Sequence, residues 1–262
     1  MNKIVLGVIC MVLFLCGQVF AELTADEIAA KAYHAAYYQG KDGRSRAVMT
    51  ATDSRSRTRE RALTILRFNI KDGADQKYFV YFQKPNDVKG MTYIVWKHAG
   101  KDDDRWLYLP ALDLVRRVAA SDKRSSFAGT NFLYEDISGR SVDLDKHELI
   151  SGDDKSYTIK NTPKDPGGVE FSCYTVFTDK QNFIPMKADY FDKDGGLYRT
   201  VEALEIKDIQ GYPTITRMKA SDMNAGSSTI TEFTSIEYDI DLSEEIFTER
   251  YLRNPPVQWI KE

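Results

Sequence analysis

Cysteine is scarce in this sequence, which limits how the fold can be held together. Only three of the 262 residues are cysteine, and Cys10 and Cys16 fall in an apolar N-terminal run. Cys173 is alone in the rest of the chain, and one cysteine cannot form an internal disulfide. We therefore expect an apolar core to hold the fold. We expect Cys173, inside the strand-like run VEFSCYTVF, to be a buried and inert thiol.

The motifs of the common enzyme classes are also missing. The chain has no H-E-x-x-H zinc motif, no G-x-S-x-G nucleophile elbow, no phosphate-binding P-loop and no glycine fingerprint for a dinucleotide. Its three histidines are too far apart in sequence for a helix-borne metal pair. We predict that the protein is not an enzyme, has no catalytic residues, and binds no metal or cofactor. A lipid hydrolase built from distant Ser, His and Asp residues is the less favoured alternative.

The chain has no excess of positive charge. Its formal net charge is −3 at pH 7, with 36 basic and 39 acidic residues. Proteins that bind nucleic acid carry clustered Lys and Arg, usually with a basic net charge. We therefore predict no nucleic-acid partner.

Long hydrophobic runs are absent, but a short one lies at the N-terminus. Lys3 precedes the apolar run Ile4–Leu15, and Ala21 ends a V-F-A cleavage pattern, as in secretory signal peptides. We predict a signal peptide at residues 1–21, cleaved after Ala21, and a mature chain of residues 22–262. An uncleaved membrane anchor is less favoured because the run is short for a bilayer. Acylation of Cys16 stays open, although Leu15 stands where such sites have a small residue.

The first element expected after the leader is a helix over residues 24–39. Thr24 and Glu27 have the spacing of a capping box, and Leu23 and Ile28 have that of a hydrophobic staple. Gly40 then supplies a stop signal. The apolar stripe of this helix consists of Ile28, Ala32, Ala35 and Ala36.

From Arg44 onward the apolar pattern changes to a period near two, which predicts strands. Hairpin-length turns separate the runs, and we find no linker that would divide the chain. We predict a mainly β (α+β) fold: a single domain whose large, curved antiparallel sheet forms an unclosed barrel. The strand-like runs are residues 46–52, 62–70, 76–83, 91–98, 105–110, 114–120, 155–162, 168–179, 186–193, 197–208, 214–223 and 228–240.

Two of these runs are apolar on both faces. In YFVYF, Tyr78, Val80 and Phe82 face one way, while Phe79 and Tyr81 face the other. In RWLYL, the side chains of residues 106 and 108 oppose those of residues 107 and 109. Such strands need cover on both sides, and the helix and the segment near 125–138 can cover only part of a broad sheet. The uncovered part is either ordinary barrel core or a surface for an apolar ligand.

The pair Arg116-Arg117 follows the RWLYL run. Neighbouring strand residues point to opposite faces, so the two guanidinium groups cannot form one clamp. We expect one to face solvent. The other would meet an acidic headgroup or pair with Glu135 or Asp136. An ordinary ion pair at the sheet edge is an equally good interpretation.

Two stretches, RWLYLPALDLVRRV and SSFAGTNFLYEDI, resemble the LolA-like outer-membrane lipoprotein-sorting family of periplasmic proteins. The resemblance is specific over residues 75–140 and extends elsewhere only as a strand-and-turn pattern. Thr130 and Asn131 stand where a serine and an aspartate are expected. The matching positions are Trp106, Tyr108, Leu109, Pro110, Arg116, Arg117, Phe127, Gly129, Phe132, Tyr134, Glu135 and Asp136.

The resemblance implies helices that plug the concave side of the sheet and a periplasmic carrier that moves lipid or lipoprotein acyl chains between membranes. The branch of the family implies an inner-membrane lipid-exporting permease as a partner, and we expect a monomer. We take Phe127–Ile137 as a lid or rim that inserts Phe132 and Tyr134 into the empty groove, with Arg116 and Arg117 at the headgroup or rim. The residues expected to bind the ligand are Trp106, Tyr108, Leu114, Phe127, Phe132, Tyr134, Tyr78, Val80 and Phe82.

A third class of function also stays open. An apolar groove can accept a partner's helix as readily as an acyl chain. A periplasmic adaptor module of a lipid-exporting permease, without cargo of its own, would have the same sequence features.

Overall fold

The computed structural model describes residues 22–261. The expected leader, residues 1–21 with Cys10 and Cys16, lies outside the described residues. In the described part of the chain, no helix is both long enough and apolar enough to cross a membrane.

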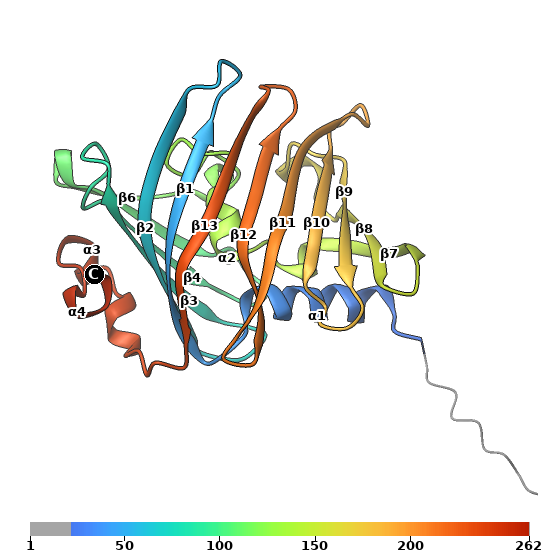
Figure 1. The fold of residues 1–262 in the computed structure, drawn as a ribbon, viewed down its shortest axis with the longest axis horizontal. Coiled ribbons are helices and arrows are strands. Elements are labelled where there is room, and N and C mark those ends of the chain that lie inside the picture. The colour runs from blue at the N-terminus through green and yellow to red at the C-terminus, as the bar shows by residue number, and fades with distance from the viewer. Residues whose placement is uncertain (1–21, 262) are drawn as a thin grey trace, which may run out of the picture.

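A single antiparallel sheet of thirteen strands forms the body of the molecule (Figure 1). The order across the sheet is β6-β5-β4-β3-β2-β1-β13-β12-β11-β10-β9-β8-β7, so β6 and β7 are the two edges. The edges do not pair with each other, which confirms the predicted unclosed barrel. The strands are β1 (Asp42–Thr52), β2 (Thr58–Asn69), β3 (Gln76–Lys84), β4 (Thr92–Lys97), β5 (Asp104–Leu109), β6 (Leu114–Arg117), β7 (Asp145–Gly152), β8 (Ser156–Pro163), β9 (Cys173–Asp179), β10 (Pro185–Phe191), β11 (Leu197–Ile209), β12 (Tyr212–Asp222) and β13 (Ser227–Tyr238).

The helices are few and short apart from the first. The α-helices are α1 (Ala25–Tyr37), α2 (Tyr134–Ser138), α3 (Arg250–Arg253) and α4 (Val257–Ile260). The 3₁₀ turns are η1 (Pro110–Leu112), η2 (Ala120–Asp122), η3 (Val142–Leu144), η4 (Pro166–Gly168) and η5 (Glu244–Phe247).

Helix α1 begins as its sequence predicts. The Glu27 amide donates to Thr24 Oγ1 at 3.2 Å, and the Thr24 amide donates to Glu27 Oε2 at 2.8 Å, which completes the capping box. The helix ends at Tyr37, and Gly40 adopts a left-handed backbone with φ of 68°. A glycine takes that conformation without steric cost, which lets the chain turn from the helix into β1.

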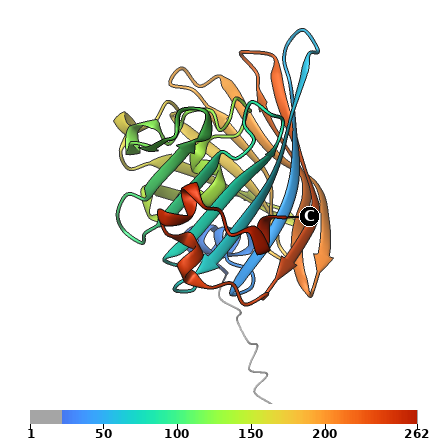
Figure 2. The ribbon, with the colours of Figure 1, turned by 90° about the vertical axis from the view of Figure 1, so that its left-hand side faces the viewer.

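The concave face of the sheet is covered by α1 and by residues 119–141, which include α2 (Figures 1 and 2). The largest apolar cluster lies there, and it includes Tyr78, Val80 and Phe82 from β3. Phe79 and Tyr81 belong to a different cluster on the outer face. The predicted alternation along YFVYF is therefore confirmed.

The outer face of β2–β5 is covered by residues 240–260, which carry η5, α3 and α4 (Figure 2). The Trp96 indole donates to the Phe247 carbonyl at 2.6 Å, and the Thr92 hydroxyl donates to the Leu252 carbonyl at 2.8 Å. We call residues 240–260 the C-terminal strap. The predicted cover of the concave face by the N-terminal helix and a short helix is confirmed, whereas the cover of the outer face by the C-terminal strap was not predicted. The helical elements of the strap have four residues each, which is too short for a helical pattern of apolar residues to be recognised in the sequence.

Strand β7 was also missed. Its sequence, DKHELISG, has a weak alternation because only its first residue is buried. An edge strand with one paired side and a mostly exposed surface needs little apolar sequence.

The strap should be part of the cooperative fold, because Phe247 is fully buried in the outer cluster. We predict that Phe247→Ala lowers the free energy of unfolding by about 3–5 kcal/mol, the usual cost of a deleted buried aromatic ring. Urea unfolding measures the change. Val257→Ala on the same strap is the control, since Val257 is exposed and its loss should cost less than about 0.5 kcal/mol. Equal, small effects of both substitutions would contradict a structural role for the strap.

Candidate functional site

A cavity of about 370 Å³ lies between helix α1 and the concave face of the sheet. Its floor comes from inward side chains of β1–β3 and β7–β13, and residues of α1 form its roof. Helix α2 and the preceding loop close one flank with Phe132 and Ile137. The apolar side chains of the floor include Ala47, Met49, Leu63, Ile65, Ile159, Val176, Ala188, Val201, Met218 and Phe233. Charged side chains, among them Arg44, Asp136, Arg140 and Lys187, line the cavity as well.

The space exists because α1 presents alanines to the sheet. Ala29, Ala32 and Ala36 lie three and four residues apart, so they share one face of the helix, and all three line the cavity. Methyl groups cannot fill the distance between a helix and a curved sheet, whereas leucine or phenylalanine would. The only large apolar side chain of α1 that is fully buried is Ile28.

Side chains from β2 and β3 hold the C-terminus of α1 in place. The Asn69 amide donates to the Tyr38 and Gly40 carbonyls at 3.2 and 2.8 Å, and the Gln76 amide donates to the Tyr37 carbonyl at 2.8 Å. The Arg67 guanidinium donates to the Gln39 carbonyl. These side chains donate to carbonyl groups that have no hydrogen-bond partner within the helix. The positive charge of Arg67 also interacts favourably with the negative end of the helix dipole. These contacts fix the height of the alanine face above the floor.

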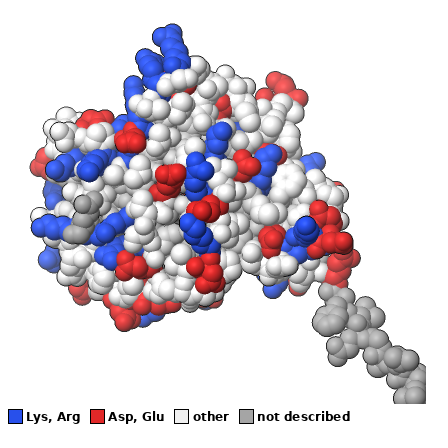
Figure 3. Space-filling view, viewed as in Figure 1, with Lys and Arg blue, Asp and Glu red and all other residues white. Residues whose placement is uncertain are grey.

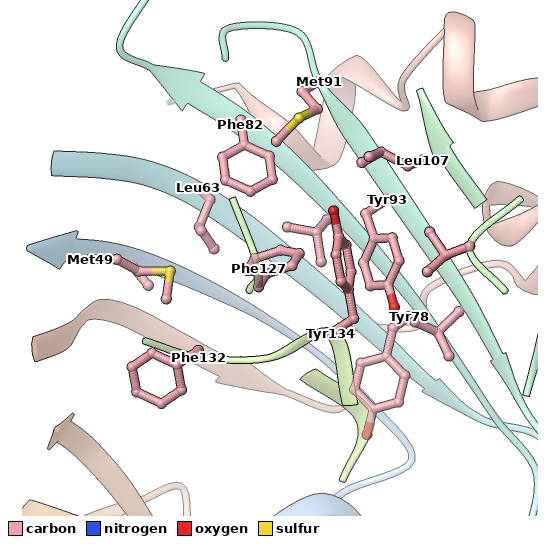
Figure 4. Packing of buried hydrophobic residues seen from close by; sticks show 14 of the residues in the cluster. Met49, Leu63, Tyr78, Phe82, Met91, Tyr93, Leu107, Phe127, Phe132 and Tyr134 are labelled. Atoms are coloured by element: carbon pink, nitrogen blue, oxygen red, sulfur yellow. The ribbon is translucent and has the colours of Figure 1, made fainter. Parts of the chain in front are cut away.

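Residues 126–138 form a plug beside the cavity (Figure 4). Phe127 is fully buried, with ring centroids 5.5 Å from Phe82, 5.6 Å from Tyr93 and 5.4 Å from Tyr134. Figure 4 places Phe132 on the other side of the plug, apart from these rings. Phe132 therefore forms a wall between the packed plug and the open cavity.

The tip of the plug is tied to the middle of the sheet. The Asn131 amide nitrogens donate to hydroxyls on β13, the backbone one to Thr229 at 2.9 Å and the side-chain one to Ser227 at 2.8 Å. The Thr229 hydroxyl donates in turn to Asn131 Oδ1 at 2.8 Å. Asn131, which departs from the family pattern, thus has a positioning role in this chain.

The base of the plug is tied to the β7–β11 half by ion pairs. Glu135 is only 2% exposed, and its carboxylate lies 2.9 Å from Arg124 Nη1 and 3.5 Å from Arg140 Nη1. Asp136 pairs with Arg199 of β11. Arg140 also forms a two-bond contact with Asp145, both bonds being 2.8 Å long. Asp136 therefore connects the plug directly with β11, and Glu135 connects it through Arg140 and Asp145 with the start of β7.

Aromatic rings pack against the arginines of this cluster. The Arg124 and Arg140 guanidinium carbons lie 5.0 and 5.4 Å from the Phe171 centroid, and that of Arg199 lies 4.9 Å from the Tyr190 centroid. Such cation–π contacts stabilise a guanidinium that has lost its water. Burial, helped by the charge of Asp145, holds the pKa of Tyr174 well above its ordinary value. The Tyr174 hydroxyl stays protonated and donates to Asp145 at 2.8 Å. We call this set of groups the arginine cluster.

A smaller polar cavity of about 260 Å³ lies between the plug base and the β4–β5 strands. Lys97 is 3% exposed there, and its ammonium donates to the Gly139 carbonyl at 2.7 Å. Burial lowers the pKa of Lys97 to about 8, while Asp103 at 3.9 Å opposes the shift. Arg105, also buried, donates to Asp103 at 2.5 Å. Within residues 22–261, no group of three or more His, Cys, Asp or Glu side chains has the arrangement of a metal site.

Comparison with known proteins identifies the family. A family model described as "Uncharacterized protein" matches residues 74–254, more than half of the chain. A DUF1329 family protein from Desulfovibrio piger has a similar structure, with a TM-score of 0.80, 29% identity, and 87% of this chain and 97% of that chain covered. A second similar structure is a domain from Vibrio parahaemolyticus described as a "putative outer membrane lipoprotein-sorting protein". Its TM-score is 0.80 and its sequence identity is 24%, and the match covers 87% of this chain and 98% of that chain. The chain belongs to the family of this model, and it has the fold of these two structures.

A more distant structure shares the same fold. It is a LolA superfamily protein from Nitrosomonas europaea, with a TM-score of 0.68, 19% identity, and 88% of this chain and 100% of that chain covered. No curated protein matches the chain in sequence.

Of the residues expected to bind ligand in this LolA-like chain, Tyr78 and Phe132 line the cavity. Four others, Val80, Phe82, Phe127 and Tyr134, lie in the packed cluster next to it rather than on its surface. The structure therefore brings six of the nine residues together, with two of them in contact with open space.

Trp106 and Tyr108 lie on the opposite face of the sheet from the cavity, against the C-terminal strap. The expectation that these two line the groove is corrected by the structure. The predicted alternation of β5 is right, but the larger aromatic side chains point outward and Leu107 points inward. Leu114 is 44% exposed on the edge strand β6, away from the cavity lining.

The arginine pair is divided between the two faces, as the strand geometry predicts. Arg117 lies on the outer face, where it pairs with Asp104 and sits 5.8 Å from the Trp106 ring. Arg116 lies near the Tyr134 hydroxyl on the inner side, where burial raises the pKa of Tyr134 and the Arg116 charge opposes that rise. Neither arginine pairs with the acidic residues of the plug, whose partners are Arg124, Arg140 and Arg199. Of the two interpretations given for the arginine pair, the ordinary ion pair at the sheet edge applies to Arg117, whose partner is Asp104.

Two groups of cavity residues were missed in the sequence. The alanines of α1 were recognised as an apolar stripe but not as the source of the space. The inward residues of β11–β13, such as Val201, Met218 and Phe233, were not considered. A signal for the inward residues of β12 and β13 is present in the sequence. Both TITRMKAS and TITEFTS alternate, so that apolar or hydroxyl side chains lie on one face of each strand. Cys173, expected to be buried, is a half-buried free thiol at the start of β9.

The buried ion pairs of the plug should be essential for stability. We predict that Glu135→Gln lowers the free energy of unfolding by about 3–5 kcal/mol, because Arg124 and Arg140 then stay buried with less opposing charge. Chemical denaturation measures the loss. The matched control is Glu232→Gln, which removes an exposed pair with Arg217 and should cost no more than about 1 kcal/mol. A cost for Glu135→Gln as small as the control's would contradict the anchoring role.

Burial of Lys97 should appear in the pH dependence of stability. Its pKa of about 8 in the folded protein lies below the ordinary value of 10.5, so between these values the unfolded chain binds more protons. The folded state is therefore penalised below pH 8, and the penalty is relieved as pH rises from about 8 to about 10. We predict that the free energy of unfolding of the wild type rises relative to Lys97→Met over this range. Parallel curves for the two proteins, measured by denaturation at each pH, would rule out the shift.

Proposed function

We propose that this LolA-like protein is a periplasmic carrier that holds an acyl chain of a lipid or lipoprotein in the cavity beneath α1. The observation that carries the proposal is the cavity itself: an apolar space of about 370 Å³ between alanines of a helix and aliphatic side chains of a sheet. Ligand pockets for small molecules have volumes from about 300 Å³ upward and are lined mainly by apolar groups.

The energetics of such a site suit reversible transport. Moving an acyl chain out of water gains about 0.8 kcal/mol per methylene, so a segment of ten methylenes gains about 8 kcal/mol. Met49 and Met218 on the floor have flexible side chains that adapt to irregular ligands. No covalent step is needed, because release follows when a receiving membrane or protein offers an equally apolar site.

The plug contributes the wall of the cavity that would contact the cargo. Phe132 stands between the packed core and the cavity, so a small change in its side-chain rotamer would change the space available. The rest of the plug is fixed at its tip by Asn131 and at its base by Glu135. We propose that Phe132 adjusts to the cargo, with Tyr78 as the facing wall, while the plug backbone stays in place.

Export and partners complete the proposal. The leader predicted at residues 1–21 would deliver the chain to the periplasm, where a soluble carrier has two membranes to serve. An inner-membrane lipid-exporting permease, as the family resemblance implies, would load or unload the cavity, and the carrier would act as a monomer.

Mass spectrometry of an organic extract, from protein purified out of the periplasm without detergent, tests the cargo. A stoichiometric lipid or acylated species supports the carrier. A clean extract, repeated after incubation with membrane vesicles, would overturn it and favour the adaptor without cargo.

Substitution of the helix roof tests whether this cavity is the site. We predict that Ala29→Trp reduces the lipid recovered per protein several-fold, because Ala29 is a half-buried residue of the cavity lining and the indole fills space that its methyl group leaves open. Ala30→Trp is the control, since Ala30 is an exposed residue of the same helix outside the cavity lining. Both variants should show unchanged circular dichroism. Equal lipid content in the two variants would mean that the cargo binds elsewhere.

A further inference from the structure

We propose that the β1–β2 hairpin and the neighbouring turns dock the protein on an anionic lipid bilayer. The hairpin projects from one end of the sheet (Figure 1), and its tip is the most prominent basic feature of the face in Figure 3. Its sequence, DSRSRTRER, contains Arg55, Arg57, Arg59 and Arg61 at every second position. This inference goes beyond the carrier function and holds whether or not the cavity contains a lipid.

The turn of the hairpin is organised to present its arginines. Asp53 Oδ1 accepts from the amides of Arg55 and Arg57 at 2.9 and 3.0 Å, and Asp53 Oδ2 accepts from Arg57 Nε at 2.7 Å. The hydrogen bonds from Arg57 lower the pKa of Asp53, so this carboxylate is ionised and its turn is fixed at neutral pH. Arg55 and Arg59 on either side are exposed and point their charge to solvent.

The next turns of the sheet place more cations at the same end. Because adjacent strands are antiparallel, the β1–β2, β3–β4 and β5–β6 turns all lie at one end of the sheet. The β3–β4 region contributes the exposed side chains of Lys84 and Lys89. We call residues 53–61, 84–89 and 110–114 the basic rim.

Most of the negative charge of the basic rim is already neutralised. Its six cations face four carboxylates, and three of these carboxylates have an arginine partner: Asp53 with Arg57, Asp87 with Arg61 and Asp113 with Arg253. In the described chain, Arg55, Arg59, Lys84 and Lys89 form no ion pair, and Glu60 is the one carboxylate of the rim left without one. The rim therefore has four cations available to an external anion.

Two exposed leucines favour a bilayer over other anionic partners. Leu112 and Leu114, in and after the β5–β6 turn, are 70% and 44% exposed. Basic side chains bind anionic headgroups at the interface, and apolar side chains beside them enter the boundary with the acyl chains. A chain with a formal net charge of −3 needs such a local concentration of cations to approach an anionic surface at all.

The other end of the same strands has the opposite character. Asp72, Asp75 and Asp102 lie in or beside the β2–β3 and β4–β5 turns, with Lys71 and Lys101 as the exposed lysines of these turns. Of these carboxylates, Asp72 lies 2.9 Å from the His34 ring and Asp102 lies 3.6 Å from the Lys123 ammonium. This charge asymmetry would orient the molecule, with the hairpin toward the membrane and the acidic end away from it.

Co-sedimentation of the mature protein with vesicles tests the proposal. We predict binding to vesicles of phosphatidylglycerol and phosphatidylcholine, no binding to phosphatidylcholine alone, and loss of binding at about 1 M salt, where the screening length is about 3 Å. The double variant R55Q/R59Q should bind roughly twenty-five-fold more weakly, since each basic side chain near an anionic surface changes the partition coefficient by about five-fold. Leu112→Gln should weaken binding at each salt concentration at which the wild type still binds.

The control is K71Q/K101Q, which removes the same charge from the acidic end and should leave vesicle binding unchanged. All variants are compared by thermal unfolding and by lipid content, neither of which should change, so a failure to dock is distinguished from a failure to carry cargo. Equal losses in the two double variants would mean that only net charge matters and would overturn the proposal. So would a wild type that ignores anionic vesicles, which would leave an acidic protein surface as the partner of the rim.

Discussion

The buried ion pairs at the base of the plug are the constraint on which the structure most depends. An open barrel has two free edges, and nothing in the sheet alone sets how far they curve toward each other. Glu135 and Asp136 join one continuous plug to Arg124, Arg140 and Arg199 around the β7–β11 half, while Phe127 and Tyr134 pack on the β2–β5 half. Isolated buried charges would each cost several kcal/mol, so the arrangement is stable only when all the partners are present. The ion pairs therefore hold the backbone of the plug in one position beside the cavity.

The cavity follows from this constraint together with the alanine face of α1. Asn69, Gln76 and Arg67 hold the C-terminus of the helix by hydrogen bonds. The helix therefore stays above the sheet, although its alanines do not fill the space between them. Close packing is the rule for protein interiors, so an apolar space maintained on both sides by rigid contacts is informative about function. The ion-pair network borders this space, since Asp136, Arg140, Tyr174 and Tyr190 also line the cavity. The same concave face therefore provides both the ion pairs that hold the plug and the space available to a ligand.

The outer face of the sheet has a separate role. Its aromatic residues, including Trp106, are covered by the C-terminal strap, so they stabilise the fold and are not available to cargo. The basic rim lies at the end of the strands, away from both faces. A molecule built in this way can approach a membrane through its turns without disturbing the packing of the plug or the strap.

Much of the fold could be predicted from local pattern, but the site could be predicted only in part. The capping box at Thr24 and Glu27 and the alternation of Tyr78, Phe79 and Val80 are properties of neighbouring residues, and both were confirmed. Strand β7 and the strap were missed because their residues become structural only against partners distant in sequence. Tyr78 and Phe132 could be assigned to the cavity because they fall in segments with a family resemblance. The floor residues of β11–β13 could not be, because their sequences have only ordinary alternation.

Local sequence pattern was enough to predict a mainly β fold, strands that are apolar on both faces, and a segment at residues 127–137 that resembles the LolA-like family. The inner face of each strand, the arginines that pair with Glu135 and Asp136, and the position of the open space became known from the tertiary structure. The physical reason is the range of the interactions. Capping and strand alternation act over two to four residues, whereas face and pairing depend on curvature and cover, which arise when segments a hundred residues apart are brought together.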